Sequence, residues 1–171
     1  MPMLQENDIL LRSLSGSDKY ELARLANNKK IWDNVRDYFP FPYTESHAEN
    51  FIMSVKSENP QVTFAIDYQR KLAGVIGLVP QNDVYKKTAE IGYWIGEEFW
   101  GKGIATTATK LITQYGLCQL DFARLHTGVF DYNIASMKVL KKCGYKKDGI
   151  FEKAVFKNGK LWDEHRYSKI K

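Results

Sequence analysis

The sequence is poor in cysteine and has no long apolar run, and each of these lacks excludes a class of protein. Its two cysteines, Cys118 and Cys143, are too few for a disulfide framework and do not have C-x-x-C spacing. No uninterrupted apolar stretch approaches the roughly 18 residues that a membrane span needs. The first residues include Glu6 and Asp8, where a secretory signal would be basic and then apolar. We therefore expect a cytoplasmic protein with reduced cysteines and no membrane partner.

Internal repeats, low-complexity tracts and Gly/Ser linkers are also missing, so nothing in the sequence marks a domain boundary. At roughly 150 residues per domain, the length of 171 residues predicts one domain, residues 1–171. Hydrophobic residues make up 44% and charged residues 26%, as in ordinary globular chains. The net charge of +5 is scattered, and no RNA-binding signature accompanies it, so a nucleic-acid partner is not expected.

Apolar periodicity divides the chain into strands and helices. The predicted strands are 9–14, 62–67, 72–79, 88–95, 124–130, 145–156 and 160–170. Three predicted helices begin at the caps Ser17, Thr44 and Asn133, and a fourth begins at Ile104. Residues 31–43, aromatic and twice broken by proline, are expected to be an ordered loop with one short helical turn. Asn158-Gly159 predicts a tight hairpin. The order β-α-α-β-β-β-α-β-α-β-β indicates a mixed α/β domain whose first half is largely antiparallel.

Residues 89–109, AEIGYWIGEEFWGKGIATTAT, are predicted to form a strand, a turn, a glycine-spaced loop and the start of a helix. Gly101 and Gly103 stand at the helix entrance, where unpaired N–H groups and the helix dipole favour an anion. The spacing is neither a P-loop nor a G-x-G-x-x-G dinucleotide fingerprint, because Thr106 stands three residues after Gly103. We expect a pyrophosphate-binding loop. The alternative is a glycine turn that only starts a helix.

This segment resembles the acetyl-CoA-binding motif of the GNAT N-acetyltransferases, Q/R-x-x-G-x-G/A, which falls here on Trp100-x-x-Gly103-x-Ala105. Trp100 in place of Gln or Arg is typical of the RimJ/RimL-type branch, the ribosomal-protein N-terminal acetyltransferases and their relatives. A second block, Asn133-Ile-Ala-Ser136-Met-Lys-Val-Leu-Lys-Lys-Cys-Gly144-Tyr145, is similar to the branch's N-x-x-S-x-x-V-L-x-K-x-G-F. The element order also matches, so the resemblance spans essentially the entire chain and implies the GNAT acyl-CoA N-acyltransferase fold.

The resemblance implies acetyl-CoA as cosubstrate. Its pyrophosphate would lie on the loop that starts at Trp100, held by the backbone amides of Gly101, Lys102, Gly103, Ile104, Ala105 and Thr106. The pantetheine arm would run like an added strand beside the main chain of Trp94 and Ile95. Asn133 would touch this arm, or serve only as a helix cap. Lys138, with the lysines that follow it, would meet the 3′-phosphate, or form a solvated helix end.

The implied reaction needs a base, because a free aliphatic ammonium has a pKa of about 10. By the resemblance Glu90 is that base, and on a two-residue period it shares a strand face with Gly92 and Trp94. The alternative is a strand-end glutamate in a salt bridge. Many GNAT enzymes use a Tyr seven residues after the Asn as general acid, but Leu140 stands there. Ser136 is the substitute that the branch suggests, or a capping partner.

The acceptor amine is expected between the first two helices and the last hairpin, where Arg36, Tyr38 and Trp162 are the candidate contacts. His165 has no partner at metal-ligand spacing, so no metal is expected. The chain is thus predicted to be an acetyl-CoA-dependent N-acetyltransferase in which the amine of a protein N-terminus or small molecule attacks directly in a ternary complex. The alternative is a non-catalytic acyl-CoA-binding module of the same fold. The acceptor's identity and the oligomeric state stay open, and a homodimer is one alternative.

Overall fold

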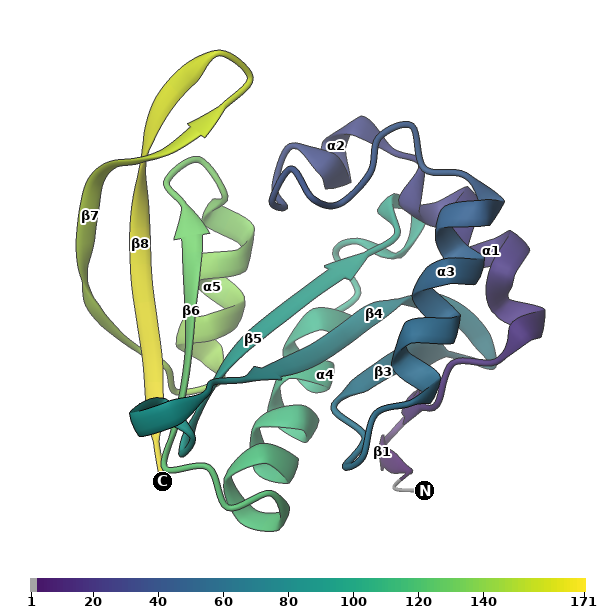
Figure 1. Cartoon of the computed structure of the whole chain (residues 1–171), viewed down its shortest axis with the longest axis horizontal. Helices are drawn as coiled ribbons and strands as arrows, with labels where there is room; N and C mark the ends of the chain where they lie inside the picture. The colour runs from purple at the N-terminus through teal and green to yellow at the C-terminus, as the bar shows by residue number, and fades with distance from the viewer. Residues whose placement is uncertain (1–2) are drawn as a thin grey trace.

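The computed structural model describes residues 3–171, which form an eight-stranded sheet flanked by helices (Figure 1). The strands are β1 (Leu4–Glu6), β2 (Ile9–Arg12), β3 (Thr63–Tyr68), β4 (Lys71–Pro80), β5 (Thr88–Ile95), β6 (Arg124–Phe130), β7 (Lys146–Lys157) and β8 (Lys160–Ile170). The helices are α1 (Lys19–Ala26), α2 (Lys29–Trp32), α3 (Glu45–Lys56), α4 (Ile104–Gln114) and α5 (Ile134–Lys142). The strand order in the sheet is β1-β2-β3-β4-β5-β6-β8-β7.

Helices cover both faces of this sheet (Figure 1). Because side chains alternate along β5 and Gly96, their contacts show which helices lie on which face. Gly96 faces Leu25 of α1, whereas Tyr93 contacts Ser136 of α5. α3 packs on α1, and α4 packs on α5. The completely buried side chains of the core include Leu11, Leu22, Phe64, Ile66, Ile76, Ile104, Ile112, Leu125 and Leu140. The face that bears Glu90 is therefore the α1–α3 face, and the opposite face packs on α4 and α5.

β5 and β6 run parallel and separate after three residue pairs. Residues 88–90 pair with residues 124–126. β5 continues to Ile95 and β6 to Phe130 without further pairing to each other, and Figure 1 shows the two strands diverging. The other edge of β6 pairs with β8 along its length. The facing edges of β5 and β6 therefore carry main-chain N–H and C=O groups with no strand partner in the gap.

The β7–β8 hairpin turns back toward the α2 region. Asn158 and Gly159 form its turn with φ of 53° and 72°, both positive as a two-residue type I′ turn requires. Next to the turn, Lys157 Nζ donates to Asp37 Oδ1 at 2.6 Å and to the Val35 carbonyl at 3.0 Å. The hairpin is thus connected to the segment that follows α2.

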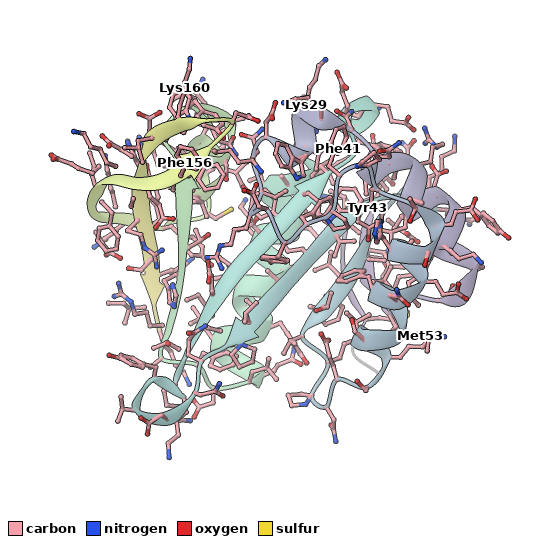
Figure 2. The ribbon with its side chains drawn as sticks, turned by 45° about the horizontal axis from the view of Figure 1, so that its top comes forward. Lys29, Phe41, Tyr43, Met53, Phe156 and Lys160 are labelled. Carbon is pink, nitrogen blue, oxygen red and sulfur yellow. The ribbon has the colours of Figure 1, made fainter. Side chains whose placement is uncertain are left out.

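The positions of labelled side chains also place the β7–β8 hairpin near the α2 region. In Figure 2, Phe156 and Lys160 of the hairpin lie at the same end of the molecule as Lys29 of α2 and Phe41 of the following loop. In Figure 1 this end lies beyond the separated tips of β5 and β6. The hairpin and α2 therefore flank the open end of the gap.

The predicted fold class and element order are confirmed, with two differences at the N-terminal end. β1 was not predicted, because three residues are too few for a periodicity and its pairing with β2 alone defines it. Ser17 does not cap the first helix: a 3-10 turn (Gly16–Asp18) capped by Ser15 precedes α1. The expected short helical turn is α2, where the Asn28 side chain accepts from the Lys30 N–H at 2.9 Å.

Candidate active site

The loop between β5 and α4 has the backbone conformation that its glycines predict. Gly101 and Gly103 have φ of 76° and 75°, a region that residues with a Cβ rarely adopt. A Cβ at either position would meet no atom within 4 Å, so the space above the loop is open. The Thr107 N–H donates to the Gly103 carbonyl as the first turn of α4 closes. The preceding amides, of Ile104, Ala105 and Thr106, have no helical acceptor and are free to bind an anion.

Aromatic side chains anchor this loop. The indole N–H of Trp100 donates to the Ile95 carbonyl at 2.7 Å and ties the loop to the end of β5. The Lys102 ammonium lies 5.4 Å from the centroid of the Phe99 ring. Trp100 remains 45% exposed, and therefore forms part of the wall beside the open space above the glycines.

The main chain of β5 offers its free groups to the gap at alternate residues. Trp94 stands opposite Val75 of β4, and two residues later the Gly96 N–H donates to the Ala73 carbonyl. In an antiparallel ladder this alternation turns the main-chain groups of Trp94 toward β4 as well. Of the two residues predicted to bind a cofactor arm through the main chain, Trp94 therefore faces β4, whereas Ile95 faces the gap with its N–H, its carbonyl being bound by the Trp100 indole. Tyr93 faces the gap in the same way.

A cleft of about 500 Å³ lies where the glycine loop, α2, the start of α5 and the hairpin meet. It brings together Trp100, Asn133 and Trp162, three of the predicted site residues. The Trp162 indole donates to the Lys157 carbonyl at 3.1 Å and packs edge-on against Tyr132, 4.8 Å between ring centroids. The lining residues are Lys30, Asp33, Asn34, Trp100, Tyr132, Asn133, Ile134, Ala135, Asn158 and Trp162.

Tyr38, a predicted acceptor contact, is not among these lining residues. It is 82% exposed, because the next residue, Phe39, takes the inward position in this loop. Phe39 packs edge-on against Trp94 at 6.0 Å between ring centroids, and in a tilted contact against Tyr43 at 5.0 Å. The side chain of Trp94 thus packs against the loop that contains Tyr38 and Phe39.

The first turn of α5 holds two predicted residues. The Asn133 side chain accepts from the Ser136 N–H at 3.2 Å, so Asn133 caps the helix, the alternative role that the sequence allowed. The Ser136 hydroxyl lies 2.9 Å from the Tyr93 hydroxyl, and burial raises the pKa of Tyr93 to about 12. Leu140, at the position of the family's acid, is completely buried. The sequence does not indicate Tyr93 as a site residue, because its partner Ser136 lies 43 residues away.

Glu90 forms an ion pair with Arg36, so the predicted salt-bridge alternative for Glu90 is present and two predicted site residues meet. Beside this pair stands His126, which is opposite Glu90 in the β5–β6 register. Arg166 Nη2 lies 3.2 Å from His126 Nδ1, and Arg166 Nη1 lies 2.7 Å from a Glu164 oxygen. Burial and the nearby Arg166 lower the pKa of His126. The sequence could not indicate that His126 and Arg166 lie near Glu90, because this depends on how β5, β6 and β8 pair.

Lys138 is exposed on α5, one turn before the end of the helix. The end of the same helix reaches the region of the glycine loop: Cys143 Sγ lies 3.4 Å from the Thr106 carbonyl in the first turn of α4. Lys141 and Lys142 are exposed in this last turn. A basic helix end therefore stands beside the open amides of α4.

Residues 3–171 contain no cluster of His, Cys, Asp and Glu that would hold a metal ion. In the same part of the chain, no helix has the length and apolar content to cross a membrane.

Comparison with known proteins identifies the class. Residues 8–146 match the family model described as an acetyltransferase (GNAT) domain. The chain therefore belongs to the GNAT acetyltransferase family, and its homologues are named N-acetyltransferases. The predicted family, fold and enzyme class are confirmed.

Individual relatives span nearly the whole chain. The spermidine N(1)-acetyltransferase of Escherichia coli K12 is 30% identical, covering 92% of this chain and 83% of its own. The microcin C7 self-immunity acetyltransferase MccE, solved with acetyl-CoA and AMP, is 29% identical with a TM-score of 0.82, over 96% and 93% of the two chains. RimL, a ribosomal alpha-N-protein acetyltransferase solved with coenzyme A, has a TM-score of 0.86 at 21% identity, over 99% and 98%, and shows the shared fold.

Proposed function

We propose that this chain transfers the acetyl group of acetyl-CoA to a primary amine, with both bound in a ternary complex and the amine attacking the thioester directly. One observation carries the proposal: the open, glycine-bearing start of α4 adjoins the unpaired edge of β5. With its pyrophosphate held at the start of α4 and its pantetheine arm along the edge of β5, acetyl-CoA would have its thioester in the gap beside Glu90 and Ser136.

The cofactor fits the residues present. The amides from Gly101 to Thr106 would hold the pyrophosphate, since a side chain at either glycine would project into the open space they face. Tyr93 and Ile95 would pair with the arm through their main chain, and Trp100 and Asn133 would line it at the cleft. Lys138, Lys141 and Lys142 would supply positive charge for the 3′-phosphate.

Glu90 would accept the proton of the acceptor ammonium, directly or through water. It is partly buried, with 20% of its side chain exposed, and faces the side of β5 opposite α4 and α5. An amine that binds Oε1 of Glu90 would take the place of the Arg36 guanidinium, which contacts that oxygen. The base and the acceptor are therefore expected on one face of β5, and acetyl-CoA is expected at the glycine loop.

Ser136 and Tyr93 would return a proton to the departing thiolate. Two hydroxyl groups that share one hydrogen bond have one O–H left to donate elsewhere. The raised pKa keeps Tyr93 protonated near neutral pH. A proton is therefore available on this pair whichever hydroxyl donates to the other.

A non-catalytic acyl-CoA-binding module remains a second candidate, and two observations favour it. Arg36 already engages the expected base, and Leu140 occupies the position of the family's acid as a buried packing residue. The acceptor class, protein N-terminus or small molecule, and a cytoplasmic setting for the two free cysteines belong to the proposal as well.

The test is release of the coenzyme A thiol with acetyl-CoA and a panel of peptides and small amines. We expect acceptor-dependent release that Gly103→Glu abolishes, because a Cβ at φ 75° is strained and its carboxylate would repel a pyrophosphate. Gly149→Ala on β7 is the matched control, since that glycine has open space and no positive φ. Tight acetyl-CoA binding without thiol release from any acceptor would establish the binding module instead.

A further inference from the structure

Charged side chains from four segments meet around Glu90 on the α1–α3 face of the sheet. Arg36, from the loop after α2, contacts Glu90 on β5. His126 on β6 lies next in register, and Arg166 on β8 contacts both His126 and Glu164. This set, Arg36, Glu90, His126, Arg166 and Glu164, is called the acceptor floor below. It lies beside the gap on the face from which an amine would approach Glu90.

The acceptor floor has no surplus of negative charge. Its two guanidiniums match its two carboxylates, and His126 is neutral near pH 7 because burial lowers its pKa. Two further carboxylates are matched as well: Asp148 contacts Arg124 at 2.6 Å, and Asp37 contacts Lys157 at 2.6 Å. An acceptor with several ammonium groups would meet no net attraction here, whereas an electrically neutral acceptor fits the balance.

Arg36 occupies one of the two Glu90 oxygens, Oε1, to which an acceptor cation would bind. Its side chain is 54% exposed, whereas the Glu90 side chain is only 20% exposed, so the arginine is the partner that can move into solvent. When an ammonium replaces it at Glu90, the guanidinium loses its carboxylate partner. A planar guanidinium binds carboxylate or phosphate oxygens in a two-pronged contact. An anionic group close to the acceptor's amine would restore the partner that Arg36 gives up.

We propose that the acceptor is a small zwitterionic amine, an amino acid or aminoalkyl phosphonate in chemical type, whose ammonium binds Glu90 and whose anionic group binds Arg36. This inference rests on the proposed function, because it assigns the acceptor of the same site. It names a substrate class and excludes polyamines, which carry several positive charges and no anion.

The experiment compares kcat/KM for matched acceptors in the purified chain with saturating acetyl-CoA. One arm uses L-amino acids, a second their aminoalkyl phosphonate analogues, a third the decarboxylated amines, and a fourth spermidine. We expect kcat/KM for the better zwitterion to be at least about tenfold higher than for its decarboxylated partner, because one charge-assisted contact changes affinity by about that factor. The first two arms show whether the anion is a carboxylate or a phosphate group.

Arg36→Gln should reverse the preference. It removes the anion partner and leaves Glu90 unpaired, so kcat/KM for the zwitterion should fall by about tenfold while that for spermidine rises. Arg36→Lys should keep part of the zwitterion preference, because a lysine retains the charge without the planar fork. Arg70→Gln, in the exposed β3–β4 turn, is the control and should leave every ratio unchanged.

Three outcomes would overturn the inference while leaving acetyl transfer established: no preference for the zwitterion, spermidine as the better acceptor of the unaltered chain, or an equal loss for all acceptors in Arg36→Gln. If neither these amines nor the peptides of the thiol-release panel are acetylated, the proposed function fails, and calorimetric titration of the zwitterions in the presence of coenzyme A decides the inference separately. Binding that Arg36→Gln weakens supports it, and absence of binding overturns it.

Discussion

The hydroxyl groups of Tyr93 and Ser136 meet at 2.9 Å between β5 and α5, beside the gap in the sheet. This contact gives the Ser136 hydroxyl a hydrogen-bond partner, Tyr93, that no family motif in the sequence indicates. If Tyr93 donates, the Ser136 proton is free to point into the gap, and the serine is polarised by the phenol. Tyr93 then acts through Ser136 as a positioning residue.

Tyr93→Phe keeps the ring and removes this partner. We expect kcat to fall by about tenfold with little change in the KM for acetyl-CoA, because a positioned proton donor contributes to the transition state alone. Ser136→Ala should cost more, and the double variant should be no worse than Ser136→Ala by itself. Steady-state kinetics of the three variants measure this coupling.

Tyr20→Phe is the control for that series, since Tyr20 is 63% exposed on α1. Additive losses in the double variant would show that Tyr93 does not act through Ser136. A fall in melting temperature with kcat unchanged would assign Tyr93 to packing alone.

At the scale of elements, α5 combines a polar first turn with an apolar stripe. Asn133 and Ser136 form the capped start, while Met137 and Leu140 are buried one turn further on. The 3.6-residue period places Leu140 on the core side of the helix. A position that holds an acid in many relatives therefore serves packing in this chain.

Leu140→Tyr tests that assignment. Leu140 is completely buried, so the larger ring should overpack the core and lower the free energy of unfolding by about 1–3 kcal/mol. We expect no gain in kcat, because the new hydroxyl would be enclosed by the core. Urea unfolding and steady-state kinetics check both statements, with Leu140→Met as the volume-matched control. A stable variant with raised kcat would contradict the core assignment.

At the scale of the whole molecule, one ionic network joins the N-terminal segments to the sheet. Arg12 on β2 contacts Asp67 of β3 at 2.7 Å and Asp18, before α1, at 2.8 Å. Burial alone would raise the pKa of Asp18, but hydrogen bonds from Arg12 and the Ser15 N–H outweigh it and hold the pKa below 3.8. The carboxylate form of Asp18 therefore stabilises the fold.

The sign of the resulting pH dependence follows from this lowered pKa. The contribution of Asp18 is fully present above its unfolded value of about 3.9 and is lost as the pH falls through the lower folded value. We expect the free energy of unfolding to decrease below about pH 4 more steeply in the unaltered chain than in Asp18→Asn. Chemical unfolding at a series of pH values measures it, with exposed Glu6→Gln as control. Parallel curves for the unaltered chain and Asp18→Asn would contradict the role of this network.

The sequence by itself determined the elements whose conformation depends on neighbouring residues. The bounds of β5, the left-handed glycines at the start of α4, the Asn133 cap and the Asn158-Gly159 turn all follow from local backbone preferences and side-chain period. The same local signals predicted the glycine loop to which we assign the cofactor.

The tertiary structure decided which side chains share a space. Tyr93 and Ser136 are 43 residues apart, and Arg36 and Glu90 are 54 apart. Such contacts depend on how strands pair and how loops pack, and no period along the chain encodes them. The outward position of Tyr38 and the charge balance of the acceptor floor arise in the same way. The acceptor side of the site is therefore a property of the packed molecule, because each of its groups comes from a different element.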